Sequence, residues 1–275
     1  MFIPTAELLK RKLAKVTSAQ FAKSGTSRAV VLVKAAPQAS GSHGETVCVA
    51  ALDEYGKWHR LYPVNFRDLA PEQRFGRWDN IEFKWRLPEV AKDRRIESKR
   101  IQQDSIVVLG SLKPKARQQF LERAIIDSPA VAYKDGKSLA LVRPQNPRFK
   151  YRRRTPQEMD AVLKKYEEIN ASPSLFGTTT IVPREPAPFE FSYAYEDGDG
   201  LHDQRCHDWE VEQTFLKWRD AYGEERALRD MMRVFGEDYP RKGMVLAMGT
   251  HGQRNWQWMI IGILRLDEIT QPSLL

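Results

Sequence analysis

The stretch DNIEFKWRL at residues 79–87 decides the fold class, because apolar and charged side chains alternate along it. Its isoleucine, phenylalanine and tryptophan fall on one side, and its glutamate, lysine and arginine fall on the other, which is the pattern of a half-buried β-strand. Upstream, RAVVLVKA at 28–35 and ETVCVAAL at 45–52 predict two buried strands. The tetrad at 53–56 predicts a hairpin turn, because Gly56 tolerates the positive φ that such turns require. Strands joined by short turns favour an antiparallel arrangement over a βαβ array.

The second half of the chain adds helices and a final hairpin. Thr155 as N-cap, Pro156 in the first turn and Glu158 in a capping box predict a helix. The predicted helices span 155–171, 208–220 and 224–235, and the predicted hairpin has arms at 243–250 and 256–266. We therefore expect an α+β fold: a mostly antiparallel sheet or small β-barrel of the PUA or OB kind with flanking helices, plus a C-terminal helix-pair and β-hairpin region.

The net charge of +8 is divided unevenly along the chain. Residues 1–154 hold 31 Lys and Arg against 15 Asp and Glu, a net charge of +16, whereas residues 155–275 hold 13 against 21, a net charge of −8. We therefore expect a basic, strand-rich nucleic-acid-binding region at 1–154, a helix and linker at 155–188, and an acidic α+β region at 189–275. Such an asymmetry between halves indicates a polyanionic partner.

The clustering of the cations favours nucleic acid as that partner. Each Lys or Arg that neutralises a phosphate releases a condensed counterion, so several together supply affinity. The stretch RFKYRRR at 148–154 mixes cations with two aromatic rings, and residues 57–64 place Trp58, Arg60 and Tyr62 on one side of a strand, where they would form a stacking platform if exposed. The predicted contacts are Trp58, Arg60, Tyr62, Arg94, Arg95, Lys99, Arg100, Arg148, Lys150, Arg152, Arg153 and Arg154.

A metal-dependent nuclease is the first alternative function. Glu82-Phe83-Lys84 and Glu97-Ser98-Lys99 fit a Glu-x-Lys element, in which two carboxylates hold a divalent ion and the lysine steadies the attacking water. The second carboxylate would come from Asp53 or Asp79 for the first element, and from Asp93 for the second. A Glu and a Lys two residues apart on a strand also simply share its wet face. We expect no cofactor, and a divalent metal ion only if this alternative holds.

Candidate metal ligands cluster in LHDQRCHDWE at 201–210. His202, Cys206 and His207 have side chains that zinc prefers, with His251 in the last hairpin turn as a possible further ligand. The competing interpretation is structural, with Asp208 capping a helix. Because no second cluster at a known spacing completes the set, we expect no metal site.

The remaining expectations concern location and partners. The chain has two widely separated cysteines and no run of 18 apolar residues, which favours a reducing, cytoplasmic location and no membrane span. The basic N-terminal segment predicts an amphipathic helix, with a transit peptide as the alternative. The last functional alternative is a non-catalytic protein-interaction or regulatory component whose acidic C-terminal half contacts a protein partner.

Overall fold

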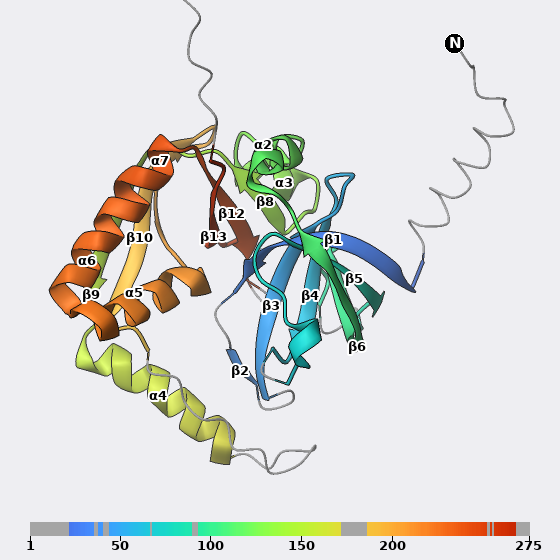
Figure 1. Cartoon of the computed structure of the whole chain (residues 1–275), viewed down its shortest axis with the longest axis horizontal. Helices are drawn as coiled ribbons and strands as arrows, with labels where there is room; N and C mark the ends of the chain where they lie inside the picture. Colours follow the sequence, from blue (N-terminus) through green and yellow to red (C-terminus); the bar gives the residue numbers. More distant parts are fainter. Residues whose placement is uncertain are drawn as a thin grey trace, which may run out of the picture.

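Five strands in the first half of the chain close into a barrel (Figure 1). They are β1 (Ser24–Lys34), β3 (Gly44–Leu52), β4 (Trp58–Val64), β5 (Asp79–Arg86) and β6 (Ser98–Ser111), and the short β2 (Gln38–Ser40) pairs with β3. The computed structural model describes residues 22–35, 38–40, 44–66, 68–89, 93–171, 186–251, 254 and 256–267. The expected N-terminal helix, apart from its last residues, and the expected linker, apart from 186–188, lie outside these residues.

The connectivity of the barrel is that of an OB domain. The strands follow one another around the ring as β1, β3, β4, β6, β5 and back to β1. The pair β4–β6 is parallel, with Arg60 opposite Ser98, and the other four pairs are antiparallel. A short 3-10 helix, η1 (Pro71–Gln73), lies between the third and fourth barrel strands. Antiparallel pairing of consecutive strands with one parallel closure defines this Greek-key barrel and confirms the predicted fold class.

The alternation in β5 sets which side chains fill the barrel. Ile81, Phe83 and Trp85 are buried, whereas Lys84 and Arg86 between them are exposed. The inward residues pack with apolar side chains of β1, β3, β4 and β6. Glu82, Lys84 and Arg86 are therefore displayed on the outside of the barrel, which is where the candidate site is found.

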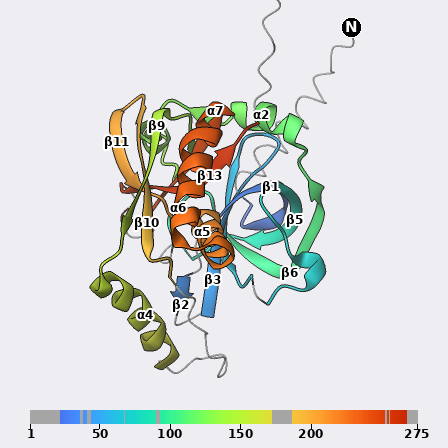
Figure 2. The same ribbon diagram turned by 60° about the vertical axis from the view of Figure 1, so that its left-hand side comes forward.

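The second half of the chain forms two further sheets with helices. Its elements are α2 (Pro114–Glu122), β7 (Ile125–Ile126), α3 (Pro129–Lys134), β8 (Leu139–Val142), β9 (Gln145–Arg153), α4 (Pro156–Ala171), β10 (Phe189–Asp197), β11 (Gly200–Arg205), α5 (Trp209–Tyr222), α6 (Glu224–Arg233), the π-helix η2 (Val234–Asp238), α7 (Tyr239–Arg241), β12 (Met244–Thr250) and β13 (Trp258–Arg265). One sheet has the order β13-β12-β8-β7 and the other β11-β10-β9. In Figure 2 the three-stranded sheet, the helices α5 and α6, and the barrel follow one another from left to right.

Local sequence signals start the helices where they were expected. Thr155 and Glu158 form the reciprocal capping box, because each backbone N–H donates to the other side chain, at 2.8 Å and 3.2 Å. Asp208 caps α5 by accepting a hydrogen bond from Glu210 N at 3.0 Å. Its buried carboxylate also pairs with Arg77 at 2.8 Å. In the described part of the chain, no helix is long and apolar enough to cross a membrane.

The sheets divide the chain near residue 124, not after Arg154. Strands β8 and β9 pair with β12 and β10, so residues 139–153 belong to the second unit. Counted by these units, residues 25–126 hold 18 Lys and Arg against 12 Asp and Glu, a net charge of +6, and residues 127–275 hold 21 against 23, a net charge of −2. The charge contrast between the units is thus smaller than the contrast between the sequence halves.

The two units share a continuous apolar core. Leu52 and Trp58, on the outer face of β3 and β4, are buried against Leu141 and Ile261 of the four-stranded sheet. The strands approach so closely that a Cβ on Gly262 would stand 2.5 Å from Val33 Cγ2. The second unit therefore covers the barrel face formed by β3 and β4.

Candidate nucleic-acid interface

Four of the five cations of the RFKYRRR stretch, all except Arg148, are neutralised by carboxylates of the acidic half. Residues 148–153 of the stretch belong to β9, beside β10. The pairs are Lys150 with Asp203, Arg152 with Glu158 and Glu190, Arg153 with Glu224, and Arg154 with Glu212. A cation that already has a carboxylate partner releases little counterion on meeting a phosphate. These paired cations would therefore contribute little to the binding of phosphates.

Two of the three residues of the predicted stacking platform on β4 are buried. Trp58 and Arg60 are only 6% and 4% exposed, because the second unit covers this face. The Arg60 guanidinium donates to Ser138 O at 2.9 Å and Ser138 Oγ at 3.2 Å, and burial lowers its pKa. Tyr62 is 38% exposed, and its hydroxyl lies 3.3 Å from Thr46 Oγ1. Period-two alternation identified a shared side for Trp58 and Arg60, but not what covers it.

Two further predicted contacts are held inside the protein. Arg95 forms a two-point ion pair with Asp93, with nitrogen–oxygen distances of 2.8 Å. Lys99 points into the barrel, where its Nζ lies 3.1 Å from the centroid of the Trp85 ring. Burial, with a smaller contribution from Lys57, lowers the pKa of Lys99 to about 8. Neither side chain is placed to meet a phosphate.

The two Glu-x-Lys elements do not assemble a metal site. Glu82 is on the outer face of β5 and pairs with Arg28 at 2.7 Å. Glu97 is buried and accepts hydrogen bonds from Ser138 N and Ser138 Oγ, both at 2.7 Å. Among the residues that the structure describes, no group of three or more His, Cys, Asp or Glu side chains is placed to hold a metal ion. No observation thus favours the nuclease alternative.

The candidate metal ligands in β11 and directly after it have different surroundings. His202 stacks on Tyr195 and its Nε2 lies 2.8 Å from Asp197 Oδ1. Cys206 is buried, and burial raises the pKa of its thiol well above the ordinary value. Burial lowers the pKa of His207 to about 4, with Arg205 adding to the effect. These side chains serve packing and local hydrogen bonding.

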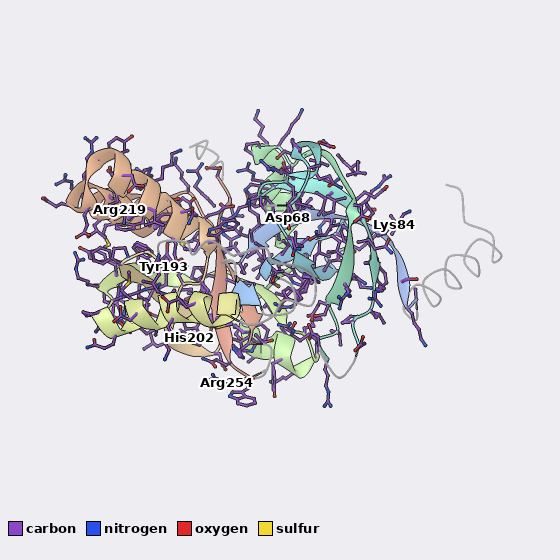
Figure 3. The ribbon with its side chains drawn as sticks, turned by 90° about the horizontal axis from the view of Figure 1, so that it is seen from below. Asp68, Lys84, Tyr193, His202, Arg219 and Arg254 are labelled. Atoms are coloured by element: carbon purple, nitrogen blue, oxygen red, sulfur yellow. The ribbon has the colours of Figure 1, made fainter. Side chains whose placement is uncertain are left out.

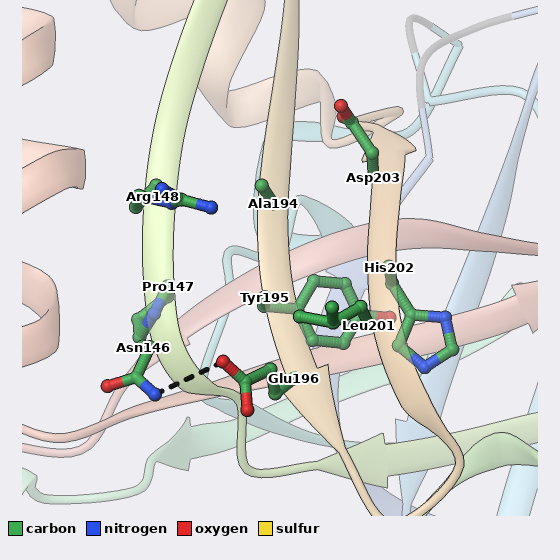
Figure 4. Close-up of a pocket in the computed structure, with 9 residues that line it drawn as sticks. All are labelled: Asn146, Pro147, Arg148, Ala194, Tyr195, Glu196, Leu201, His202 and Asp203. Carbon is green, nitrogen blue, oxygen red and sulfur yellow. Dashed lines mark hydrogen bonds between the residues drawn. The ribbon is translucent and has the colours of Figure 1, made fainter.

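A shallow hollow opens on the outer face of the three-stranded sheet (Figure 4). It forms over Ala194 of the central strand, whose short side chain leaves space between Arg148 on β9 and Asp203 on β11. Asn146 donates to Glu196 Oε1 at 3.3 Å at one end. The hollow brings Arg148 and His202 of the predicted residues to one place, but it also carries two carboxylates and so is no phosphate site by charge.

Cations without a carboxylate partner gather where β5 and β6 meet the loop between them. Lys84 and Arg86 are exposed at the end of β5, Arg94 is exposed in the loop, and half-buried Arg100 lies at the start of β6. No carboxylate of the described residues forms an ion pair with any of these four. We call Lys84, Arg86, Arg94 and Arg100 the β5–β6 patch. Figure 3 shows Lys84 on the barrel side of the molecule.

The pairing register places two arginines of this patch directly opposite each other. Arg86 pairs with Arg100 across the antiparallel strands β5 and β6, and Ser24 of β1 is the next residue in the same row. Like charges directly opposite each other on a sheet are destabilising unless an anion compensates them. Sequence reasoning identified Arg94 and Arg100 but missed Arg86. The outward position of Arg86 was visible in the alternation, but its partner was not.

The fold defines a protein of two units, an OB-type barrel joined to an α+β unit that covers one barrel face. Residues 25–126 match a domain of unknown function, DUF8758, and residues 123–274 match a second one, DUF8757. The second match spans more than half of the chain, which therefore belongs to the DUF8757 family. The boundary between the two matches coincides with the division between the sheets.

Other comparisons add little. No curated protein matches the chain. One similar solved chain belongs to work on the "Molecular basis for abrogation of activation of pro-inflammatory cytokines"; it is 8% identical with a TM-score of 0.27, over 66% of this chain and 75% of that chain. Another belongs to a replication protein A heterotrimer bound to ssDNA; it is 10% identical with a TM-score of 0.26, over 91% of this chain and 68% of that chain. At TM-scores this low, neither likeness carries an argument.

Proposed function

We propose that this protein binds nucleic acid through the β5–β6 patch. The observation that carries the proposal is the pair Arg86 and Arg100, which lie directly opposite each other without a described carboxylate partner. A phosphate between the two guanidinium groups would relieve their repulsion and accept charge-assisted hydrogen bonds from both. The loop between the fourth and fifth strands, which carries Arg94, is one of the elements with which OB barrels contact oligonucleotides.

The spacing of the patch fits a chain of phosphates. Lys84 and Arg86 are two residues apart on one face of β5, about 7 Å along the strand, and Arg100 is on the neighbouring strand about 5 Å away. Uncharged polar residues, Thr26 and Gln102, flank Lys84 in the same row. A backbone with one negative charge per nucleotide can thus meet several cations of the patch together. An isolated carboxylate of a protein partner would meet only one or two.

The test is the salt dependence of binding in two charge-matched variants. One variant carries Lys84→Gln, Arg86→Gln and Arg100→Gln in the patch, and the other carries Lys150→Gln, Arg152→Gln and Arg153→Gln at paired cations. Fluorescence anisotropy would follow labelled single-stranded DNA, RNA and duplex DNA between about 50 and about 400 mM salt. Both variants lose three positive charges, so a difference between them reports position and not net charge.

We expect the patch variant to lose about 2 units of the slope of log K against log salt on single strands, because each phosphate contact contributes about 0.7. The β9 variant should keep the wild-type slope, since its cations are neutralised within the fold. Equal behaviour of the two variants would refute the assignment to the patch. Absence of binding by the wild type to every oligonucleotide at the lowest salt would refute the function itself and favour the protein-interaction alternative.

A further inference from the structure

The β5–β6 loop is attached to the second unit next to its last hairpin turn. Arg95, held in place by the carboxylate of Asp93, donates from Nη1 to Thr250 O at 3.4 Å. Thr250 is the last residue of β12 and pairs with Trp258 at the start of β13. We call the described residues between them, 251, 254, 256 and 257, the β12–β13 turn. Arg95 of the loop thus lies beside Thr250, the residue from which the turn begins.

The β12–β13 turn displays an exposed tryptophan. Trp256 is 65% exposed, whereas the other six tryptophans of the chain are buried or half-buried. Leaving most of an indole in water forgoes the burial free energy that a large aromatic side chain offers. An exposed aromatic ring of this size is typical of a surface that meets a partner.

The turn and the β5–β6 loop each carry an exposed arginine. Arg254 is exposed in the turn, and Arg94 is exposed in the loop that Arg95 attaches to it. Neither arginine forms an ion pair with a described carboxylate. Figure 3 shows Arg254 at the edge of the molecule, away from the barrel side on which Lys84 lies. The combination of an exposed ring and unpaired arginines matches a nucleic-acid base and its phosphates better than it matches an apolar protein surface.

We propose that a single strand of nucleic acid crosses the junction of the two units here, with one base stacked on Trp256 and its phosphates at Arg254 and Arg94. This inference rests on the proposed function and adds the class of ligand. A single strand is required, because the faces of bases inside a duplex are covered by their neighbours and cannot stack on a side chain. Because every base has a face that can stack on an indole ring, we expect little base preference at this position.

The experiment compares Trp256→Ala, Trp256→Phe and Tyr222→Ala in the full-length protein. Tyr222, at the end of α5, is 54% exposed and serves as the matched exposed aromatic away from the turn. Affinities for a single strand of about 15 nucleotides and for a duplex of the same length would be measured by anisotropy as a function of salt. Circular dichroism would confirm that each variant is folded.

We expect Trp256→Ala to weaken single-strand binding about tenfold or more, as the loss of one stacked base does, without changing the salt slope. Trp256→Phe should stay within about threefold, because it keeps an aromatic face. Tyr222→Ala should bind as the wild type does, and duplex affinity should be the same in all variants.

Three outcomes would overturn the inference. If Trp256→Ala binds single strands like the wild type, the ring does not contact a base, whereas the proposed function stands. If Trp256→Ala weakens single-strand and duplex binding equally, the restriction to single strands is refuted. If the wild type binds nothing at low salt, both this inference and the proposed function fail.

Discussion

Substituting Gly262 by alanine tests the contact between the barrel and the second unit. The added Cβ would stand 2.5 Å from Val33 Cγ2 and 3.4 Å from the Cβ of Ala247. Carbon atoms in favourable contact are about 3.5 to 4.0 Å apart, so the first approach overlaps by about 1 Å. Because Val33 is fully buried near the end of β1, the overlap must be relieved by moving backbone. We expect a loss of about 1–3 kcal/mol in the free energy of unfolding.

Three further variants test whether the loss in Gly262→Ala comes from its contact with Val33. Val33→Ala alone should cost about 2 kcal/mol, since it removes two buried methyl groups. In the double variant the new methyl group at position 262 occupies part of the vacated space, so the total loss should be smaller than the sum by about 1 kcal/mol. Gly249→Ala is the control: its added Cβ would meet Ile261 Cδ1 at 2.8 Å, the end of a flexible side chain that can rotate away.

Urea unfolding followed by tryptophan fluorescence would supply the four free energies. Gly249→Ala should cost less than about 1 kcal/mol. If Gly262→Ala is harmless, or if the losses of the two single variants add within about 0.5 kcal/mol in the double variant, β13 does not lie against β1 as described. The covering of the barrel face would then have to be reconsidered.

Two further changes probe buried charged groups. The pKa of Lys99 is about 8 in the folded chain against 10.5 ordinarily, so the folded state binds fewer protons between these values, and stability should rise with pH across that window. In Lys99→Met this contribution should vanish in urea titrations from pH about 7.5 to about 10.5, and an unchanged rise would contradict the assignment. Glu97→Gln should cost about 1–3 kcal/mol, because an amide group replaces one of the two acceptors that Ser138 uses. Glu225→Gln, at a side chain that is 93% exposed, should be neutral, and a similar loss in both variants would count against the buried bond.

Local rules predicted those parts of the fold that depend on residues close in sequence. The alternation in 79–87 gave the faces of β5, and Thr155, Glu158 and Asp208 gave the helix starts, because a cap bonds to a neighbour only two or three residues away. The strand content and the short turns were enough to predict a mostly antiparallel sheet or a small barrel, but not to choose between them. The parallel closure of β4 on β6 was not visible, since it depends on pairing between distant strands.

The candidate site was harder to predict for the same physical reason. Period-two alternation shows that side chains share a face of the sheet, but not whether that face is exposed to solvent. Arg60 is buried on its face of β4 and donates to Ser138, which is 78 residues away in the sequence. On β9, Lys150 and Arg153 are neutralised by carboxylates that lie more than 50 residues away in the sequence. Conversely, the meeting of Arg86 with Arg100 required the register of two strands, so sequence could indicate cations but not which remain unpaired.

The apolar surface that β1, β3 and β4 turn toward the four-stranded sheet limits how this chain can be divided. Excising the barrel near residue 126 would expose Val30, Leu32, Leu52 and Trp58 to solvent as one contiguous wall. A soluble protein rarely tolerates such a wall, so the fragment would self-associate or precipitate. A soluble stand-alone barrel would need polar replacements at those four positions. Binding measured with an unmodified fragment would reflect non-specific association through the exposed apolar surface, and not specific binding of a ligand.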